Sequence, residues 1–355
     1  MKVAHIVPNL NTGGAEKLIV DSLSIYNLKN IDTELIVLQE VNNIFSKTIK
    51  GNIMYISEKS PYNLIYIFEL TKLLKRYDLV HVHLFPTLYW VVLAKILSFS
   101  KVKIVYTEHN TSNRRRNSFF FKICDRFIYS RLDYIGCISK ACYKNLVQHL
   151  NYKKESIGII ENGIDLNVYK KNVDVIDNKL FDTEDFVLIQ VSSFREQKDQ
   201  KTLIKAMSLL PKEIKLLLVG DGHLRKECEE LAKQLKVFDR IKFLGNRIDI
   251  PQLFKSSDLA IQSSNYEGFG LVSVEAMASG RAIIASDVEG LSDVVRGYGV
   301  LFTKGNSKEL VDEILKFYND KSYKEEIECK CKKRANDFDI NNMVEKYISI
   351  YQSVI

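Results

Sequence analysis

Short apolar runs alternate with helix-favouring stretches along most of this chain. In the first half, the apolar runs lie at 2–7, 34–38, 52–56, 78–84, 103–108, 133–139 and 157–161. Runs of this length, separated by helical stretches such as 62–76 and 87–97, predict the buried strands of a doubly wound parallel sheet.

The pattern starts afresh after a polar segment at 170–184, which has no amphipathic period and indicates a linker or a surface excursion. The later apolar runs lie at 186–191, 215–219, 258–262 and 282–286, and the chain closes with helical stretches at 308–318 and 324–353. A chain of 355 residues is long enough for two domains, each with its own core. We therefore predict an α/β protein with two parallel-sheet domains.

One strand-to-helix turn carries most of the chemical information. The run at 258–262 leads into Glu267, Gly268, Phe269 and Gly270, and helix formers continue from there to 278. The glycines allow backbone to approach a ligand, and the helix start offers free N–H groups to a phosphate. Carboxylates beside an anion site suggest that the ligand also carries hydroxyl groups. Glu267 and Glu275 therefore favour a sugar nucleotide.

Charge and hydropathy narrow the possible partners. Residues 1–165 hold 22 Lys and Arg against 14 Asp and Glu, whereas residues 166–355 hold 29 against 30. An excess confined to the first half indicates an anionic partner there: a nucleic acid, a membrane surface or a phosphorylated acceptor. No apolar run reaches the roughly 18 residues of a membrane span, and the chain opens on a strand instead of a signal peptide. We expect a cytoplasmic protein.

Cysteine and acidic motifs give no metal site. The six cysteines form no C-x-x-C pair, and Cys329 and Cys331 lack the further ligands of a metal site, so reduced structural thiols are expected. Asp337 and Asp339 form a D-x-D by chance, far from any glycine loop. We expect no cofactor and no metal ligands.

The stretch EGFGLVSVEAMASG, with seven residues between Glu267 and Glu275, resembles the E-x7-E signature of the retaining GT-B glycosyltransferases of family 4. The resemblance implies two Rossmann-like domains facing across a cleft. It places an acceptor-binding domain at 1–165 and a nucleotide-sugar-binding domain at 166–340. A C-terminal helix at 341–355 is expected to return to the first domain.

The resemblance also assigns roles to residues. The Gly13–Gly14 turn resembles the family loop whose second glycine lies against the donor diphosphate, and His109 matches a histidine that approaches the donor sugar. Lys198 matches the family's cation, whereas the family arginine is replaced by Ser193. Arg195, two residues later, is either its substitute or a surface charge. His81 and His83 are expected to be buried core histidines.

Together these assignments define a catalytic set and a donor-binding set. The catalytic candidates are Glu267, His109, Lys198 and Arg195. The donor-binding candidates are Gly13, Gly14, Glu275, Gly268, Phe269, Gly270, Leu271, Val272, Gly220, Asn246 and Arg247. Cations and a helix N-terminus would then stabilise the departing diphosphate without a metal.

A basic, aromatic segment at 114–129 has two interpretations. Arg114, Arg115, Arg116 and Lys122 beside three phenylalanines are typical of an interfacial membrane contact. The alternative is a solvated loop followed by a helix whose phenylalanines face the core. No nucleic-acid motif accompanies the segment.

The predicted function is a retaining, metal-independent transfer from a nucleotide-diphosphate sugar to a glycan or lipid-linked acceptor, in cell-surface polysaccharide or lipopolysaccharide assembly. A UDP-sugar donor is favoured over GDP-mannose. The first domain could then contact the inner face of the cell membrane. The alternatives are a GT-B-like UDP-sugar epimerase and a non-enzymatic protein that binds anionic surfaces.

Overall fold

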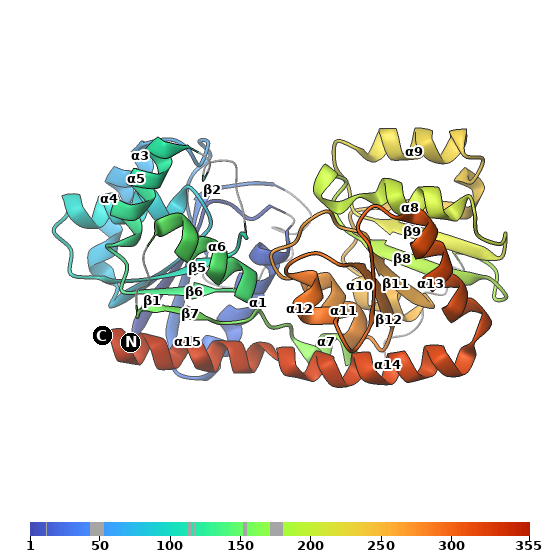
Figure 1. Ribbon diagram of the computed structural model, residues 1–355. Helices are drawn as coiled ribbons and strands as arrows, with labels where there is room; N and C mark the ends of the chain where they lie inside the picture. Colours follow the sequence, from blue (N-terminus) through green and yellow to red (C-terminus); the bar gives the residue numbers. More distant parts are fainter. Residues whose placement is uncertain (12, 43–52, 112–115, 117, 152–154, 171–179) are drawn as a thin grey trace. The chain divides into compact units, whose positions relative to one another are not determined.

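The computed structural model describes residues 1–11, 13–42, 53–111, 116, 118–151, 155–170 and 180–355 (Figure 1). These residues form two compact units, Met1–Gly163 with Ile340–Ile355, and Ile164–Asp339. The chain passes between the units at 163–164 and at 339–340, close to the boundaries of 165 and 340 that the sequence suggests.

Parallel strands build the sheet of the first unit. Among the described residues their order is β3-β2-β1-β4-β5-β6-β7. The bounds are β1 (Lys2–Val7), β2 (Asp32–Gln39), β3 (Ile53–Ser57), β4 (Leu79–His83), β5 (Lys103–Glu108), β6 (Tyr134–Cys137) and β7 (Ile157–Ile159). The central strands are almost wholly buried, which explains why they are continuous apolar runs in the sequence.

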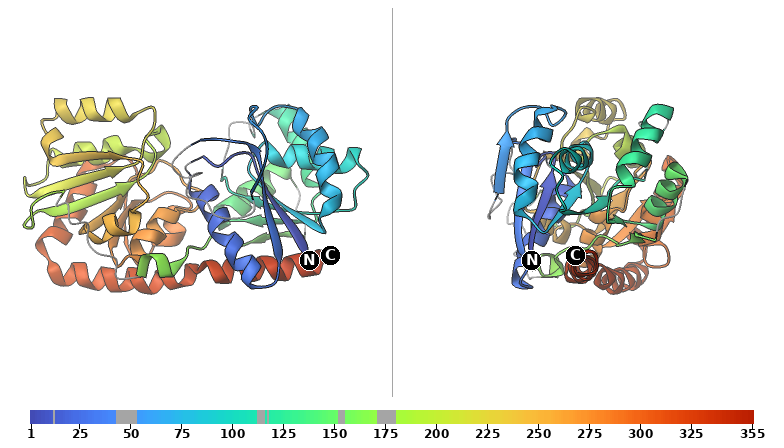
Figure 2. Two further views of the ribbon diagram at one scale, coloured as in Figure 1. Left: turned by 180° about the vertical axis from the view of Figure 1, so that it is seen from behind. Right: turned by 90° about the vertical axis from the view of Figure 1, so that its left-hand side faces the viewer.

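Helices of the first unit form two packed groups. The bounds are α1 (Gly14–Leu28), α3 (Ile65–Leu73), α4 (Thr87–Leu97), α5 (Phe119–Tyr129), α6 (Lys140–Leu150) and α15 (Ile340–Val354). The C-terminal α15 packs against α1, while α4 contacts both α3 and α5, and α5 contacts α6. Both chain ends lie side by side in this unit in every view (Figures 1 and 2).

The second unit repeats the architecture. Its described strands are all parallel, in the order β10-β9-β8-β11-β12-β13. The bounds are β8 (Phe186–Val191), β9 (Ile214–Val219), β10 (Ile241–Gly245), β11 (Leu259–Gln262), β12 (Ala282–Ser286) and β13 (Val300–Phe302). The helices are α7 (Leu166–Lys170), α8 (Gln200–Met207), α9 (Arg225–Gln234), α10 (Ile250–Lys255), α11 (Leu271–Ala278), α12 (Leu291–Val295), α13 (Ser307–Asn319) and α14 (Lys321–Ala335).

The long helical stretch expected at 324–353 is broken. Helix α14 ends at Ala335, a 3₁₀ turn spans Asn336–Phe338, and Asp339 is extended before α15 begins. Ile164 pairs with Asp339 in a β-bridge, and its N–H donates to the carbonyl of Phe338 at 2.9 Å. The break therefore coincides with the point where the chain leaves the second unit. In the described part of the chain, no helix is both long and apolar enough to span a bilayer.

Candidate active site

The strand order of the second unit reverses between β8 and β11, so the loops after these two strands start at neighbouring points of one sheet edge. Open α/β sheets bind ligands at the carboxyl ends of the strands where the order reverses. The loop after β8 carries Arg195 and Lys198, and the loop after β11 carries Glu267 and Gly270. The topology thus brings together residues about 70 positions apart.

Lys198 and Glu267 form an ion pair at this point. The ammonium contacts Oε1 of Glu267, and the same oxygen accepts hydrogen bonds from Ser264 Oγ at 3.0 Å and Gln262 Nε2 at 3.3 Å. Both charged side chains are largely buried, with 18% and 8% exposure. Surrounding donors hold the Glu267 carboxylate in one orientation at the end of β11.

Gly270 lies between this pair and α11. Its φ of 91° is in the left-handed region, where glycine is strain-free. Within the described chain, no side chain caps the start of α11, whose first-turn N–H groups come from Leu271 and Val272. The Ser273 hydroxyl in that turn is fully buried and has no hydrogen-bond partner among the described residues. An uncapped helix start beside a lysine suits an anion such as a phosphate.

Close backbone approaches hold the surrounding loops together. A Cβ on Gly290 would lie 2.5 Å from the carbonyl oxygen of Glu267, and one on Gly220 would lie 2.2 Å from that of Ser192. Both glycines have positive φ, 87° and 127°. The loops that follow β9 and β12 therefore pack directly on the backbone of the loops that carry Lys198 and Glu267.

Other predicted donor-site residues differ in exposure. Glu275 is buried in the second turn of α11, and Phe269 is buried against the ring of Phe338 at 5.3 Å. Arg195 is exposed at the start of the 3₁₀ turn Glu196–Lys198. Asn246 and Arg247 lie exposed beyond β10, and Arg247 pairs with Asp249 at 2.5 Å.

The remaining predicted residues belong to the first unit. Gly13 is the extended residue before α1, and Gly14 opens that helix. His109 is buried just beyond β5, and burial lowers its pKa to about 4, so its imidazole is neutral at pH 7. His81 and His83 are buried as expected.

Arg116 corrects one expectation. Its guanidinium, 9% exposed, pairs with the buried carboxylate of Glu108 at 2.7 Å and donates to the Thr111 carbonyl at 3.1 Å. Burial alone would lower the pKa of this guanidinium, but Glu108 outweighs that effect and raises the pKa above its ordinary value. Arg116 is therefore an internal cation that contacts Glu108 and the Thr111 carbonyl, not a surface charge. Arg114 and Arg115 lie outside the described residues.

Helix α5 carries the aromatic side chains of this segment. Phe119 and Phe120 are 79% and 68% exposed, and Ile123 and Phe127 are also exposed. The alternative in which the phenylalanines face the core does not hold for Phe119 and Phe120. Lys122, which is half-buried, lies on the same helix.

Gln262 and Ser264, which donate to Glu267, were missed as site residues. The available signal was a polar residue at the last position of β11, Gln262, followed by Ser263 and Ser264, because parallel strands place their sites at that end.

Two family models match adjoining parts of the chain. The model described as "Glycosyltransferase Family 4" matches residues 33–168, and "Glycosyl transferases group 1" matches residues 173–336. The chain belongs to the family 4 glycosyltransferases. It is an enzyme with the GT-B fold.

Known relatives of this glycosyltransferase span most of its length. N-acetyl-alpha-D-glucosaminyl L-malate synthase from Bacillus anthracis is 28% identical over 333 residues, 88% of this chain and 85% of the relative. A Campylobacter jejuni N-acetylgalactosaminyltransferase named for a diphospho-undecaprenol-linked acceptor is 24% identical over 95% of this chain and 96% of its own. The structure of Anabaena HepE in complex with UDP and glucose superposes with a TM-score of 0.88 at 24% identity, covering 99% of this chain and 100% of that one.

Proposed function

We propose that this glycosyltransferase transfers a sugar, with retention of anomeric configuration and without a metal ion, from a UDP-sugar to a glycan or lipid-linked acceptor in cell-surface polysaccharide assembly. The observation that carries the donor assignment is the convergence of Lys198, Glu267 and the uncapped start of α11 at one edge of the second sheet. The UDP in the HepE complex supports a uridine donor, with GDP-mannose the second choice. The diphospho-undecaprenol acceptor named for the Campylobacter relative supports a lipid-linked acceptor.

The charge that forms on the departing diphosphate suggests a role for each site residue. Departure of a nucleoside diphosphate builds negative charge on phosphate, which the Lys198 ammonium and the N–H groups of Leu271 and Val272 can stabilise. Arg195 is exposed on the same loop as Lys198 and supplies a second cation. These groups replace the metal ion in this proposal. Glu267 holds hydroxyls of the donor sugar and Glu275 those of the ribose, while Gly13, Gly14 and His109 are the first unit's candidate donor contacts.

A thermal-shift panel of UDP, GDP, ADP and their common sugar conjugates, with and without EDTA, tests this proposal. A nucleotide at a hundred times its Kd adds about 2.7 kcal/mol to the free energy of unfolding of the unit that binds it. We expect UDP compounds to raise the melting temperature equally with and without EDTA. A shift that EDTA abolishes would contradict metal independence, and the absence of any shift would contradict the donor site.

We also propose that the exposed face of α5 contacts an anionic membrane at which a lipid-linked acceptor is presented. Phe119, Phe120, Ile123 and Phe127 are exposed on this helix, and Arg126 and Lys122 add positive charge. Exposed aromatic residues next to basic ones are the composition of interfacial helices. The excess positive charge of residues 1–165 also favours binding to an anionic membrane.

Replacing both Phe119 and Phe120 with serine should weaken binding to vesicles that contain phosphatidylglycerol. Burying one such side chain is worth about 1.5–3 kcal/mol, so the double variant should lose at least about tenfold in affinity. Vesicle co-sedimentation measures this loss. Leu209→Ser, at a residue 56% exposed in the second unit, is the matched control and should bind as the unaltered protein does. Equal binding by all three proteins would remove the membrane proposal.

A further inference from the structure

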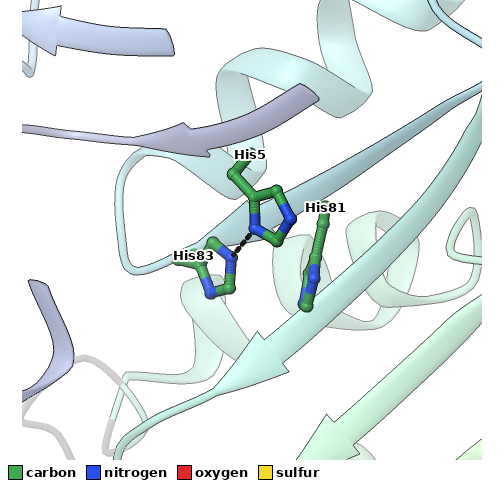
Figure 3. A group of neighbouring side chains, drawn as sticks. All are labelled: His5, His81 and His83. Carbon is green, nitrogen blue, oxygen red and sulfur yellow. Dashed lines mark hydrogen bonds between the residues drawn. The ribbon is translucent and has the colours of Figure 1, made fainter. Parts of the chain in front are cut away.

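Buried histidines cluster on one face of the first unit's sheet (Figure 3). His5 lies on β1, and His81 and His83 lie on the adjacent β4, with His5 and His81 as register partners. All three are at most 4% exposed. Tyrosines from α1 and α15 border the cluster, namely Tyr26, Tyr347 and Tyr351.

Two hydrogen bonds form a chain from His5 through His83 to His109. His5 Nδ1 lies 3.2 Å from His83 Nε2, and His83 Nδ1 lies 3.3 Å from His109 Nε2. His83 thus uses both ring nitrogens, one toward His5 and the other toward His109, which lies just beyond β5. The first of these bonds is drawn in Figure 3.

The protonation of the three rings fixes the direction of these bonds. Burial lowers the pKa of His5 to about 3 and that of His109 to about 4, and it also holds the pKa of His83 well below its ordinary value. Each ring is therefore neutral at pH 7, with one N–H donor and one bare nitrogen. Because His83 takes part in both bonds, the two bonds must point the same way. All three rings are then either Nδ1–H tautomers or Nε2–H tautomers.

His81 takes no part in this chain. Its Nδ1 lies 2.5 Å from the hydroxyl of Tyr351, and its Nε2 lies 2.7 Å from that of Thr107. The ring nitrogens of His5, His81 and His83 are close enough to suit a metal ion. However, an ion bound by all three would have to break one of the two His81 bonds and one of the two His83 bonds. The geometry favours a hydrogen-bonded relay.

We propose that His83, supported by His5, is a positioning residue that sets the tautomer and ring orientation of His109. The inference rests on the proposed contact of His109 with the donor sugar, where the tautomer decides whether the ring donates to or accepts from a hydroxyl. His5 Nε2, at the inner end, has no hydrogen-bond partner among the described residues. The His5 side chain is among those lining a cavity of about 20 Å³, large enough for one water.

Nitrogen-15 NMR of the histidine side chains tests the relay without reference to catalysis. The chain has six histidines, so each ring can be assigned with one substitution apiece. At pH 7 we expect His5, His83 and His109 to show the same tautomer. We expect His83→Phe to leave His109 as a tautomer mixture, whereas His81→Gln leaves it unchanged. Different tautomers in the unaltered protein, or an unchanged His109 in His83→Phe, would overturn the proposal. So would joint shifts of His5, His81 and His83 on adding equimolar Zn²⁺.

Kinetics give the second readout. His83→Phe should lower kcat by about tenfold or more through misplacement of His109, with the donor KM within about twofold. His83→Gln, which keeps a donor and an acceptor, should recover part of kcat and also serves if His83→Phe does not fold. A common tautomer together with full activity of His109→Ala would preserve the relay and contradict the proposed function of His109. A kcat of His83→Phe equal to that of the unaltered enzyme would contradict the positioning role itself.

Discussion

Glu267→Gln is expected to lower kcat by about 10²- to 10³-fold while the protein stays folded. The amide has the shape of the carboxylate but lacks its charge and its second acceptor oxygen, so hydroxyls of the donor sugar lose their partner. Transfer is measured with the donor that the nucleotide panel identifies. Near-normal turnover would contradict the role of Glu267.

Variants at Lys198 separate what its ion pair with Glu267 contributes to stability from what it contributes to catalysis. Lys198→Met leaves the buried Glu267 carboxylate without its cation, so it should lower the free energy of unfolding by up to about 3 kcal/mol as well as the activity. The double variant Lys198→Met/Glu267→Gln removes both charges. It should recover most of the stability and none of the activity. Recovery of activity in the double variant would show that the pair is only structural.

The first unit is expected to unfold steeply on acidification below about pH 6. His5, His81, His83 and His109 are buried and neutral, and burial holds the pKa of each below the ordinary 6.5. Between pH 6.5 and about 4 the unfolded chain therefore binds protons that the folded unit does not. Stability present above pH 6.5 is lost as pH falls, by up to about 1.4 kcal/mol per pH unit for each histidine.

Trp90, the chain's single tryptophan, reports this transition because it lies on α4 of the first unit. Urea unfolding followed by its fluorescence at several pH values should show the midpoint falling from pH 6.5 to 4.5. His81→Gln should flatten that dependence, whereas His223→Gln, at an exposed position of the second unit, should not. A midpoint independent of pH in this range would contradict neutral burial of the cluster.

The strands could be predicted because they are buried on both faces and therefore form apolar runs in the sequence. The interruption between α14 and α15 was missed within the expected stretch 324–353, although Asn336 and Asp337 are poor helix formers. The bridge between Ile164 and Asp339 that accompanies it is long-range, so no local pattern signals it. The strand Val300–Phe302 was missed because three residues give no periodicity.

The candidate site divides in the same way. Glu267 and the glycine turn form a local motif and the family resemblance singles out Lys198, so the sequence could suggest all three, and the strand order then explains why they meet. The burial of Arg116 could not be predicted. Its partner Glu108 lies eight residues earlier, and the sequence between them has no periodic pattern that would predict the contact. The link from His83 to His109 depends on two strands and a loop meeting in three dimensions, and no spacing in the sequence predicts it.

Calorimetric titration of UDP into the unaltered enzyme and Lys198→Met, in the presence of EDTA, tests the central claim most directly. If the diphosphate binds at the start of α11 beside Lys198, the unaltered enzyme binds UDP without metal. The variant should then bind at least about tenfold more weakly, a difference of about 1.4 kcal/mol. Equal affinity in the two proteins would contradict the assignment of this sheet edge as the donor site.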